Sequence, residues 1–129
     1  MKKVLFVCIH NSGRSQMAEA LFNYLAKGQV LALSAGTMPA DSINLQAIEA
    51  MAEMGIDITG SKPKLMTMQM IKNANRAITM GCNVAETCPA TFVPTEDWGL
   101  DDPAGQPLEQ VRRIRDQIEA KVKVLIQDL

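Results

Sequence analysis

The fold of this chain is decided by residues 4–15, Val-Leu-Phe-Val-Cys-Ile-His-Asn-Ser-Gly-Arg-Ser. Residues 4–8 are apolar without interruption, which is typical of a strand covered on both faces of a parallel sheet. Gly13 then marks a loop, and apolar side chains recur at helical spacing up to Gly28, namely Met17, Ala18, Leu21, Phe22 and Leu25. The stretch therefore predicts a strand, a short loop and a helix.

The rest of the chain repeats this alternation. Further strands are expected at residues 30–34, 77–80 and 96–98, further helices at 62–75 and 108–129, and loops at 81–94 and 101–107. One more helix is expected to begin at a cap formed by Asp41 or Ser42 and to end at Gly55. Alternating strands and helices predict an α/β fold with a mostly parallel sheet and right-handed crossovers, built as a single domain over residues 1–129. A ligand is expected at the carboxyl ends of the strands.

Composition and charge exclude several classes of function. A net charge of −1 gives no general attraction to nucleic acid or to an anionic membrane, so any bound anion must be held by a local site. The apolar run after Lys2 and Lys3 is too short for a signal peptide, and no stretch approaches a membrane span, so we expect a cytoplasmic protein. Three cysteines in such a compartment suggest catalytic or redox thiols rather than structural disulfides.

The loop between the first strand and the first helix has the residues of an oxyanion site. Backbone N–H groups in a short loop that leads into a helix form a nest for a tetrahedral anion, here from Ile9, His10, Asn11, Ser12, Gly13 and Arg14. Gly13 permits a tight turn and a close approach to the ligand. The planar fork of Arg14 can hold two oxygens of the anion.

Cys8 lies at the start of this loop and is the candidate nucleophile. A helix N-terminus and a cationic neighbour favour the thiolate form, and Ser15 could donate a hydrogen bond to it. The alternative is that Cys8 is a buried apolar residue at the end of a strand. His10 is the only histidine, and an exposed loop position is favoured over a catalytic role.

The sequence VLFVCIHNSGRSQMAEA resembles the signature of the low-molecular-weight protein tyrosine phosphatase superfamily, which includes thioredoxin-coupled arsenate reductases. The resemblance implies a four-stranded parallel sheet flanked by helices. It also implies that Asp102, directly before Pro103, is the general acid on a loop, with Asp101 as a bystander. Both activities of the superfamily would begin with attack of Cys8 on a tetrahedral anion and need such an acid.

The second step separates a reductase from a phosphatase. Water completes phosphoester hydrolysis, whereas reduction of arsenate to arsenite needs a second thiol and ends in a disulfide. Cys82 and Cys88 supply candidate thiols, and the resemblance implies a relay from Cys8 to Cys82, then to Cys88, and finally to thioredoxin. The stretch DWGLDDPAGQP also resembles the reductases, because Ala104 stands where the phosphatases usually carry an aromatic residue. The sequence therefore predicts an arsenate reductase serving arsenic detoxification, with a low-molecular-weight phosphatase as the alternative.

Other readings of these residues stay open. Cys82 and Cys88 are separated by five residues, whereas the thioredoxin-coupled pattern has six, so another thiol donor could replace thioredoxin. The two cysteines could also be loop residues with no partner, and the oxyanion loop could serve a module that binds anions without catalysis. A zinc site is disfavoured, because the cysteines and the histidine lack paired ligand spacing.

Some relatives bind potassium beneath the loop. Asn11, Glu19 and Ser34 match ligands of that site, but Lys64 replaces a fourth, acidic ligand. We expect the Lys64 ammonium to take the place of the ion, and we expect no metal or organic cofactor. Arsenate is the expected ligand, with phosphate or sulfate as mimics.

Overall fold

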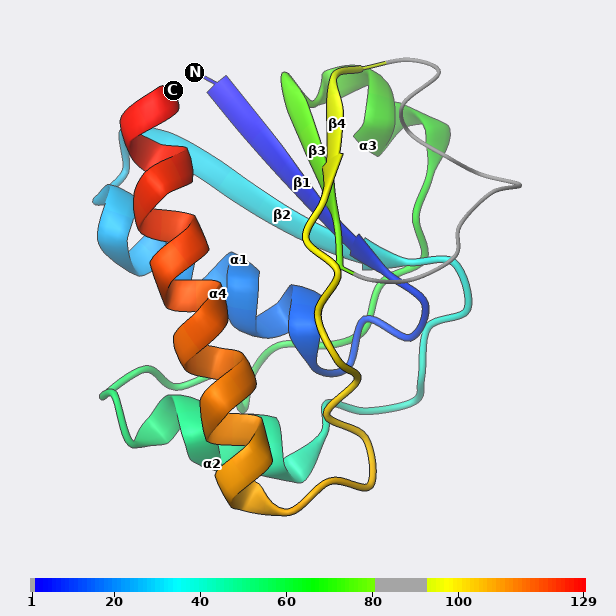
Figure 1. The fold of residues 1–129 in the computed structure, drawn as a ribbon. Helices are drawn as coiled ribbons and strands as arrows, with labels where there is room; N and C mark the ends of the chain where they lie inside the picture. Colours follow the sequence, from blue (N-terminus) through cyan, green and yellow to red (C-terminus); the bar gives the residue numbers. More distant parts are fainter. Residues whose placement is uncertain (1, 81–92) are drawn as a thin grey trace.

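Four parallel strands form the sheet, in the order β2-β1-β3-β4 (Figure 1). The computed structural model describes residues 2–80 and 93–129. The strands are β1 (Lys2–Cys8), β2 (Val30–Gly36), β3 (Arg76–Thr79) and β4 (Thr95–Asp97). Their register brings the carboxyl ends together, since Cys8 pairs with Gly36, Val7 with Thr79, and Thr79 with Asp97. The predicted four-stranded parallel sheet is confirmed.

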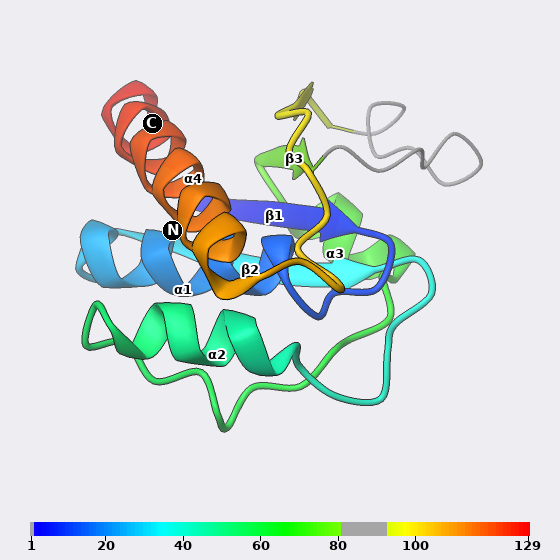
Figure 2. The same cartoon turned by 60° about the horizontal axis from the view of Figure 1, so that its bottom comes forward.

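Helices cover both faces of this sheet. They are α1 (Arg14–Ala26), α2 (Leu45–Ala52), α3 (Met68–Asn73) and α4 (Leu108–Asp128). In Figures 1 and 2, α1 and α4 lie side by side, and α1 packs on β1 and β2 while α2 packs against α4. The short helix α3 also contacts β1, whose residues 4–8 are buried. None of the described helices is long and apolar enough to cross a membrane.

The core forms where the apolar run of β1 meets the two long helices. Phe6 is fully buried, with the Phe22 ring edge-on at 6.0 Å and the Trp98 ring at 5.5 Å between centroids. An apolar stripe of α4 faces this core, and its buried members are Val111, Ile114, Ile118, Val122 and Leu125. Burial on both faces of the sheet explains why residues 4–8 of β1 are all apolar.

Two details of the predicted helices are wrong. The cap of α2 is Asn44, whose Oδ1 accepts the backbone N–H groups of Gln46 and Ala47 at 2.8 and 3.2 Å, and not Asp41 or Ser42. The helix expected over residues 62–75 is limited to Met68–Asn73. Residues before it are extended, because Lys64 and Met66 hydrogen-bond the backbone of Gly36 at the end of β2.

Candidate active site

Cys8 is the last residue of β1, and residues 8–15, the oxyanion loop, carry the chain from β1 into α1 (Figures 1 and 2). The first helical backbone bond of α1 is from Met17 N to Gly13 O, at 2.9 Å. The N–H groups before Met17 therefore have no partner within the helix. They give this end of a 13-residue helix a positive potential beside a buried sulfur.

The outer side of the oxyanion loop is held by a second segment. Residues 37–44, the rim segment, donate backbone N–H groups to the carbonyls of the oxyanion loop. The pairs are Thr37 to Cys8, Met38 to Ile9, Ala40 to His10, and Asn44 to Ser12, at 2.8–3.3 Å. The N–H of a trans peptide points away from its carbonyl, so the amides that follow these carbonyls face away from the rim. The rim segment thus orients the loop amides toward the centre of the loop, where an anion would bind.

The sulfur of Cys8 has two hydrogen-bond partners within this loop. The backbone N–H of Asn11 donates to Sγ at 3.1 Å, and Ser15 Oγ lies 2.9 Å from Sγ. Asn11 Nδ2 donates to Ser15 Oγ at 2.7 Å, so the single hydroxyl hydrogen of Ser15 is directed at the sulfur. Two donors aimed at one sulfur stabilise the thiolate. This is the arrangement of an activated nucleophile.

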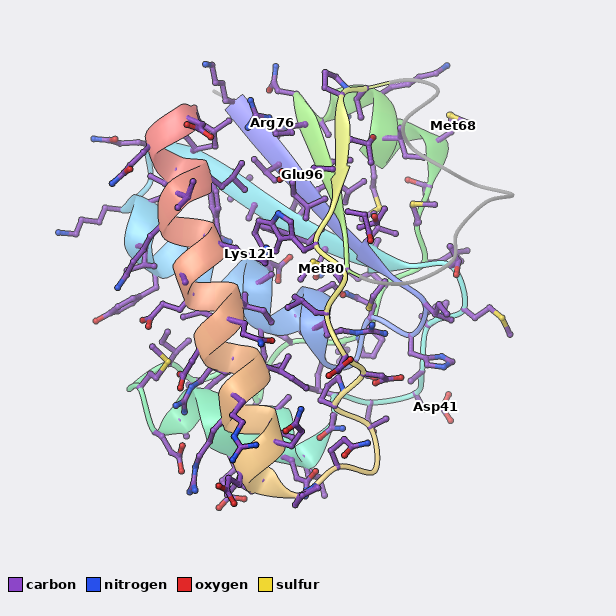
Figure 3. The ribbon with its side chains drawn as sticks, viewed as in Figure 1. Asp41, Met68, Arg76, Met80, Glu96 and Lys121 are labelled. Atoms are coloured by element: carbon purple, nitrogen blue, oxygen red, sulfur yellow. The ribbon has the colours of Figure 1, made fainter. Side chains whose placement is uncertain are left out.

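Arg14 joins the oxyanion loop to two other parts of the chain. Its guanidinium is buried, and Nη1 donates to the carbonyls of Met80 and Leu100 at 2.7 and 2.9 Å. Met80 follows the last residue of β3 and lies near the lower end of the sheet in Figure 3. Nη2 lies 3.8 Å from Asp102 Oδ2. The two backbone contacts fix the guanidinium between the oxyanion loop and the acid loop, residues 101–107.

The acid loop lies directly against the oxyanion loop. A Cβ built on Gly13 would lie 2.7 Å from Pro103 Cγ, so only glycine leaves room for Pro103. Gly13 has φ −137°, outside the left-handed region, and the contact with Pro103 gives a steric reason for the glycine. Asp102 Oδ1 accepts the N–H of Ala104 at 2.9 Å, which leaves Oδ2 facing Arg14. Asp102 is half exposed, with 54% of its side chain accessible, so it can exchange protons with solvent.

Of the remaining predicted site residues, three are described by the structure and two lie outside the described residues. His10 is exposed, as expected, and its Nδ1 lies 3.0 Å from the carbonyl of Met38, which fixes the ring to the rim segment. Ile9 and Ser12 are half-buried. Cys82 and Cys88 lie outside the described residues, and within the described part of the chain no cluster of His, Cys, Asp or Glu could hold a metal ion.

Sequence reasoning missed residues that support the loop from beneath. A Cβ on Gly36 would lie 2.6 Å from the Ile9 carbonyl and 3.0 Å from Asn11 N, so a glycine is needed where β2 passes the oxyanion loop. A glycine at the end of a strand was the available signal. The buried amide of Gln16 was missed as well. It donates to Asn11 Oδ1 at 3.0 Å.

A pocket of about 540 Å³ lies elsewhere, between β4 and α4. Arg76, Glu96 and Lys121 line it, and Figure 3 shows Arg76 at the opposite end of β3 from Met80. No residue of the oxyanion loop contributes to this pocket. The candidate active site is therefore identified by its hydrogen bonds and charges and not by the volume of a cavity.

Comparison with known proteins agrees with this geometry. Residues 3–129 match the family described as low molecular weight phosphotyrosine protein phosphatase. The chain belongs to this family. Within it, the chain is 39% identical to the arsenate reductase of Staphylococcus aureus over 124 residues, which cover 95% of this chain and 94% of the relative.

Solved structures of family members superpose on the whole fold. One is an arsenate reductase in the phosphate-binding state, with a TM-score of 0.89, 36% identity and coverage of 99% of this chain and 98% of the other. Another is the thioredoxin-dependent arsenate reductase of Corynebacterium glutamicum, with a TM-score of 0.85 and 33% identity. The match covers 99% of this chain and 61% of that longer chain. Both comparisons support the predicted membership of the low-molecular-weight phosphatase superfamily.

Proposed function

We propose that this protein reduces arsenate to arsenite, with Cys8 as nucleophile. The observation that carries the proposal is a buried sulfur that accepts hydrogen bonds from Asn11 N and Ser15 Oγ, in the loop that leads into α1 and contains Arg14. The similarity to arsenate reductases at 39% identity over nearly the whole chain favours arsenate as the substrate. Arsenate and phosphate are both tetrahedral anions, and phosphate is expected to compete for the same loop amides.

In the first step the Cys8 thiolate attacks arsenic, and an oxygen of arsenate departs. Arg14 and the loop amides neutralise charge on the remaining oxygens. Asp102 Oδ2 faces Arg14, so a proton held on that oxygen is placed to pass to the departing oxygen, which leaves as water. The product of this step is a covalent adduct with an S–As bond between Cys8 and arsenic, in which arsenic is still pentavalent.

In the second step a thiol of Cys82 attacks the sulfur of Cys8. The new S–S bond forms as the S–As bond breaks, and the electron pair of that bond stays on arsenic, which leaves as trivalent arsenite. Cys88 then attacks Cys82, which releases the Cys8 thiolate and leaves a Cys82–Cys88 disulfide. An external dithiol of the thioredoxin class reduces this bond, in keeping with the thioredoxin-dependent relative. Such a relay suits the reducing cytoplasm.

The alternative is hydrolysis of a phosphoester through a phosphocysteine at Cys8. The family description favours it, because the oxyanion loop, Arg14 and Asp102 would serve both reactions. Pro103 is followed by Ala104 and Gly105, so the acid loop offers no aromatic wall for a phosphotyrosine ring. We therefore rank hydrolysis second.

Lys64 sets the expected response to potassium. Its Nζ lies 3.4 Å from Glu19 Oε1, and Asn11 Oδ1 already accepts N–H groups from Gln16 and from the Lys64 backbone. Ser34 Oγ is buried without a hydrogen-bond partner in the described part of the chain. Because an ammonium already neutralises Glu19, these residues do not fit a potassium ion. The proposed mechanism needs no metal.

A parallel assay tests the proposal. The protein is supplied with arsenate and, separately, thioredoxin, glutaredoxin or a small thiol, and arsenite release is measured while an aryl phosphate is offered in a second series. We expect arsenite with at least one donor and little phosphate release. Rapid phosphate release without arsenite would favour the phosphatase. Turnover by Cys88→Ser with thioredoxin as sole donor would remove Cys88 from the relay.

A further inference from the structure

Gln16 is a polar residue in the first turn of α1 that neither the motif nor the mechanism above uses. It is 1% exposed, and its Nε2 donates to Asn11 Oδ1 and to the carbonyl of Lys62, both at 3.0 Å. A buried amide is costly unless it is hydrogen-bonded. Nε2 of Gln16 meets this need through both of its bonds, whereas Oε1 has no hydrogen-bond partner among the described residues. We infer that Gln16 is a positioning residue, which holds Asn11 and through it the hydrogen bonds that Cys8 receives. This inference deepens the proposed function and rests on Cys8 being its nucleophile.

The directions of the hydrogen bonds form one chain that ends at the sulfur. The Lys64 backbone N–H can only donate, so the Asn11 atom that it meets at 2.9 Å is the oxygen. The Gln16 atom that faces this oxygen is therefore its amide nitrogen. The other end of the Asn11 amide is then a donor, and it meets Ser15 Oγ. Each donor thus points one step closer to Cys8.

Asn11 needs such support because its backbone is in the left-handed region, with φ +50°. This conformation is unfavourable for a residue with a side chain and persists where surrounding contacts enforce it. In this conformation its N–H reaches Cys8 Sγ at 3.1 Å. Without Gln16, Asn11 Oδ1 would keep only the Lys64 backbone donor. The loss would loosen both the Asn11 and the Ser15 donors of the sulfur.

The second acceptor of Gln16 extends this role. Lys62 precedes the stretch that pairs with Gly36, through Lys64 and Met66, at the end of β2. One buried amide therefore joins the oxyanion loop to the backbone beneath it. Gln16 Nε2 donates to Asn11 and to Lys62, so the path from Gln16 to Cys8 runs through Asn11.

The test measures the reactivity of Cys8 directly. The protein is alkylated with iodoacetamide across a pH series and digested with trypsin, and the peptide of residues 4–14, which contains Cys8 but neither of the other cysteines, is quantified by mass spectrometry. Gln16→Met keeps the length of the side chain and removes its donors. We expect the pH of half-maximal alkylation to rise by roughly 0.5–1 unit, the effect of losing about one hydrogen bond.

Two comparisons separate positioning from general destabilisation. Asn11→Gly keeps the left-handed backbone accessible and removes the side chain, so Gln16→Met should add no further change in that background. Met17→Leu alters a buried neighbour on the same helix and should leave the profile unchanged. Should Gln16→Met fail to fold, Gln16→Glu carries the test, because its carboxylate cannot donate and should shift the profile in the same direction.

An unchanged profile in the Gln16 variants, or an equal shift in both backgrounds, would overturn the inference. The measurement uses no arsenate. Wild-type protein that fails to reduce arsenate would therefore refute the proposed function while leaving this test of Gln16 intact.

Discussion

Gly13→Ala is expected to separate the acid loop from the oxyanion loop while leaving the nucleophile in place. A Cβ at this position would lie 2.7 Å from Pro103 Cγ, whereas carbon atoms pack at about 3.5–4.0 Å, so Pro103 must retreat by about 1 Å. Asp102 precedes Pro103 and moves with it. A displacement of about 1 Å at a catalytic group can cost about 100-fold in rate, so we expect kcat for arsenite formation to fall by about 10- to 100-fold.

The assay pairs steady-state arsenite formation with alkylation of Cys8. The hydrogen bonds that Cys8 Sγ makes with Asn11 N and Ser15 Oγ do not involve Pro103, so alkylation of Cys8 should be unchanged while kcat falls. Pro103→Ala provides the matched background, because it removes Cγ and keeps only Cβ, which lies 4.0 Å from the new methyl group. Gly13→Ala should therefore cost little when combined with Pro103→Ala. An equal loss of kcat in both backgrounds, or none in the single variant, would refute the steric reasoning.

Three further predictions concern charged groups. Arg14→Lys loses the two carbonyl contacts of Nη1, so KM for arsenate should rise at least about 10-fold, and an unchanged KM would contradict the anion clamp. Hydrogen bonds from Arg112 and Arg115 of α4 lower the pKa of Glu53 below its usual value of 4.5. The stability that the Glu53 carboxylate gives the fold is therefore present above pH 4.5 and is lost as the pH falls. Glu53→Gln should therefore lower the Tm at pH 7 by a few degrees at most, with a difference that shrinks below pH 4.5; a constant difference would argue against the ion pairs. Activity should be equal in sodium and potassium salts, whereas Lys64→Asp should gain a potassium response; a wild-type rate that rises with potassium would contradict the role of Lys64.

Local patterns in the sequence predicted the elements that carry most of the core. The apolar run of β1 and the helical spacing within α4 are properties of neighbouring residues, and both elements appear where expected. The cap of α2 and the extended residues near Lys64 could not be found in this way. They depend on backbone hydrogen bonds between distant segments, from Asn44 to Ser12 and from Gly36 to Lys64.

The candidate site was predictable to the extent that it is a motif. Cys8, Arg14 and Asp102 were named from the sequence, and the structure brings the oxyanion loop and the acid loop together. The carbonyls that hold Arg14 belong to Met80 and Leu100, and a backbone carbonyl leaves no mark on residue identity. Supports of this kind become visible only when distant parts of the chain are in contact.

The most direct test of the central claim is a single turnover without any external reductant. Stoichiometric protein is mixed with arsenate, and arsenite and the remaining thiols are counted. If Cys8 attacks arsenic and a second thiol of the same chain supplies the electrons, each chain should release one arsenite and lose two thiols, and Cys8→Ser should release none. Arsenite formed by Cys8→Ser, or arsenite formed by wild-type protein that keeps all three of its thiols, would contradict the account.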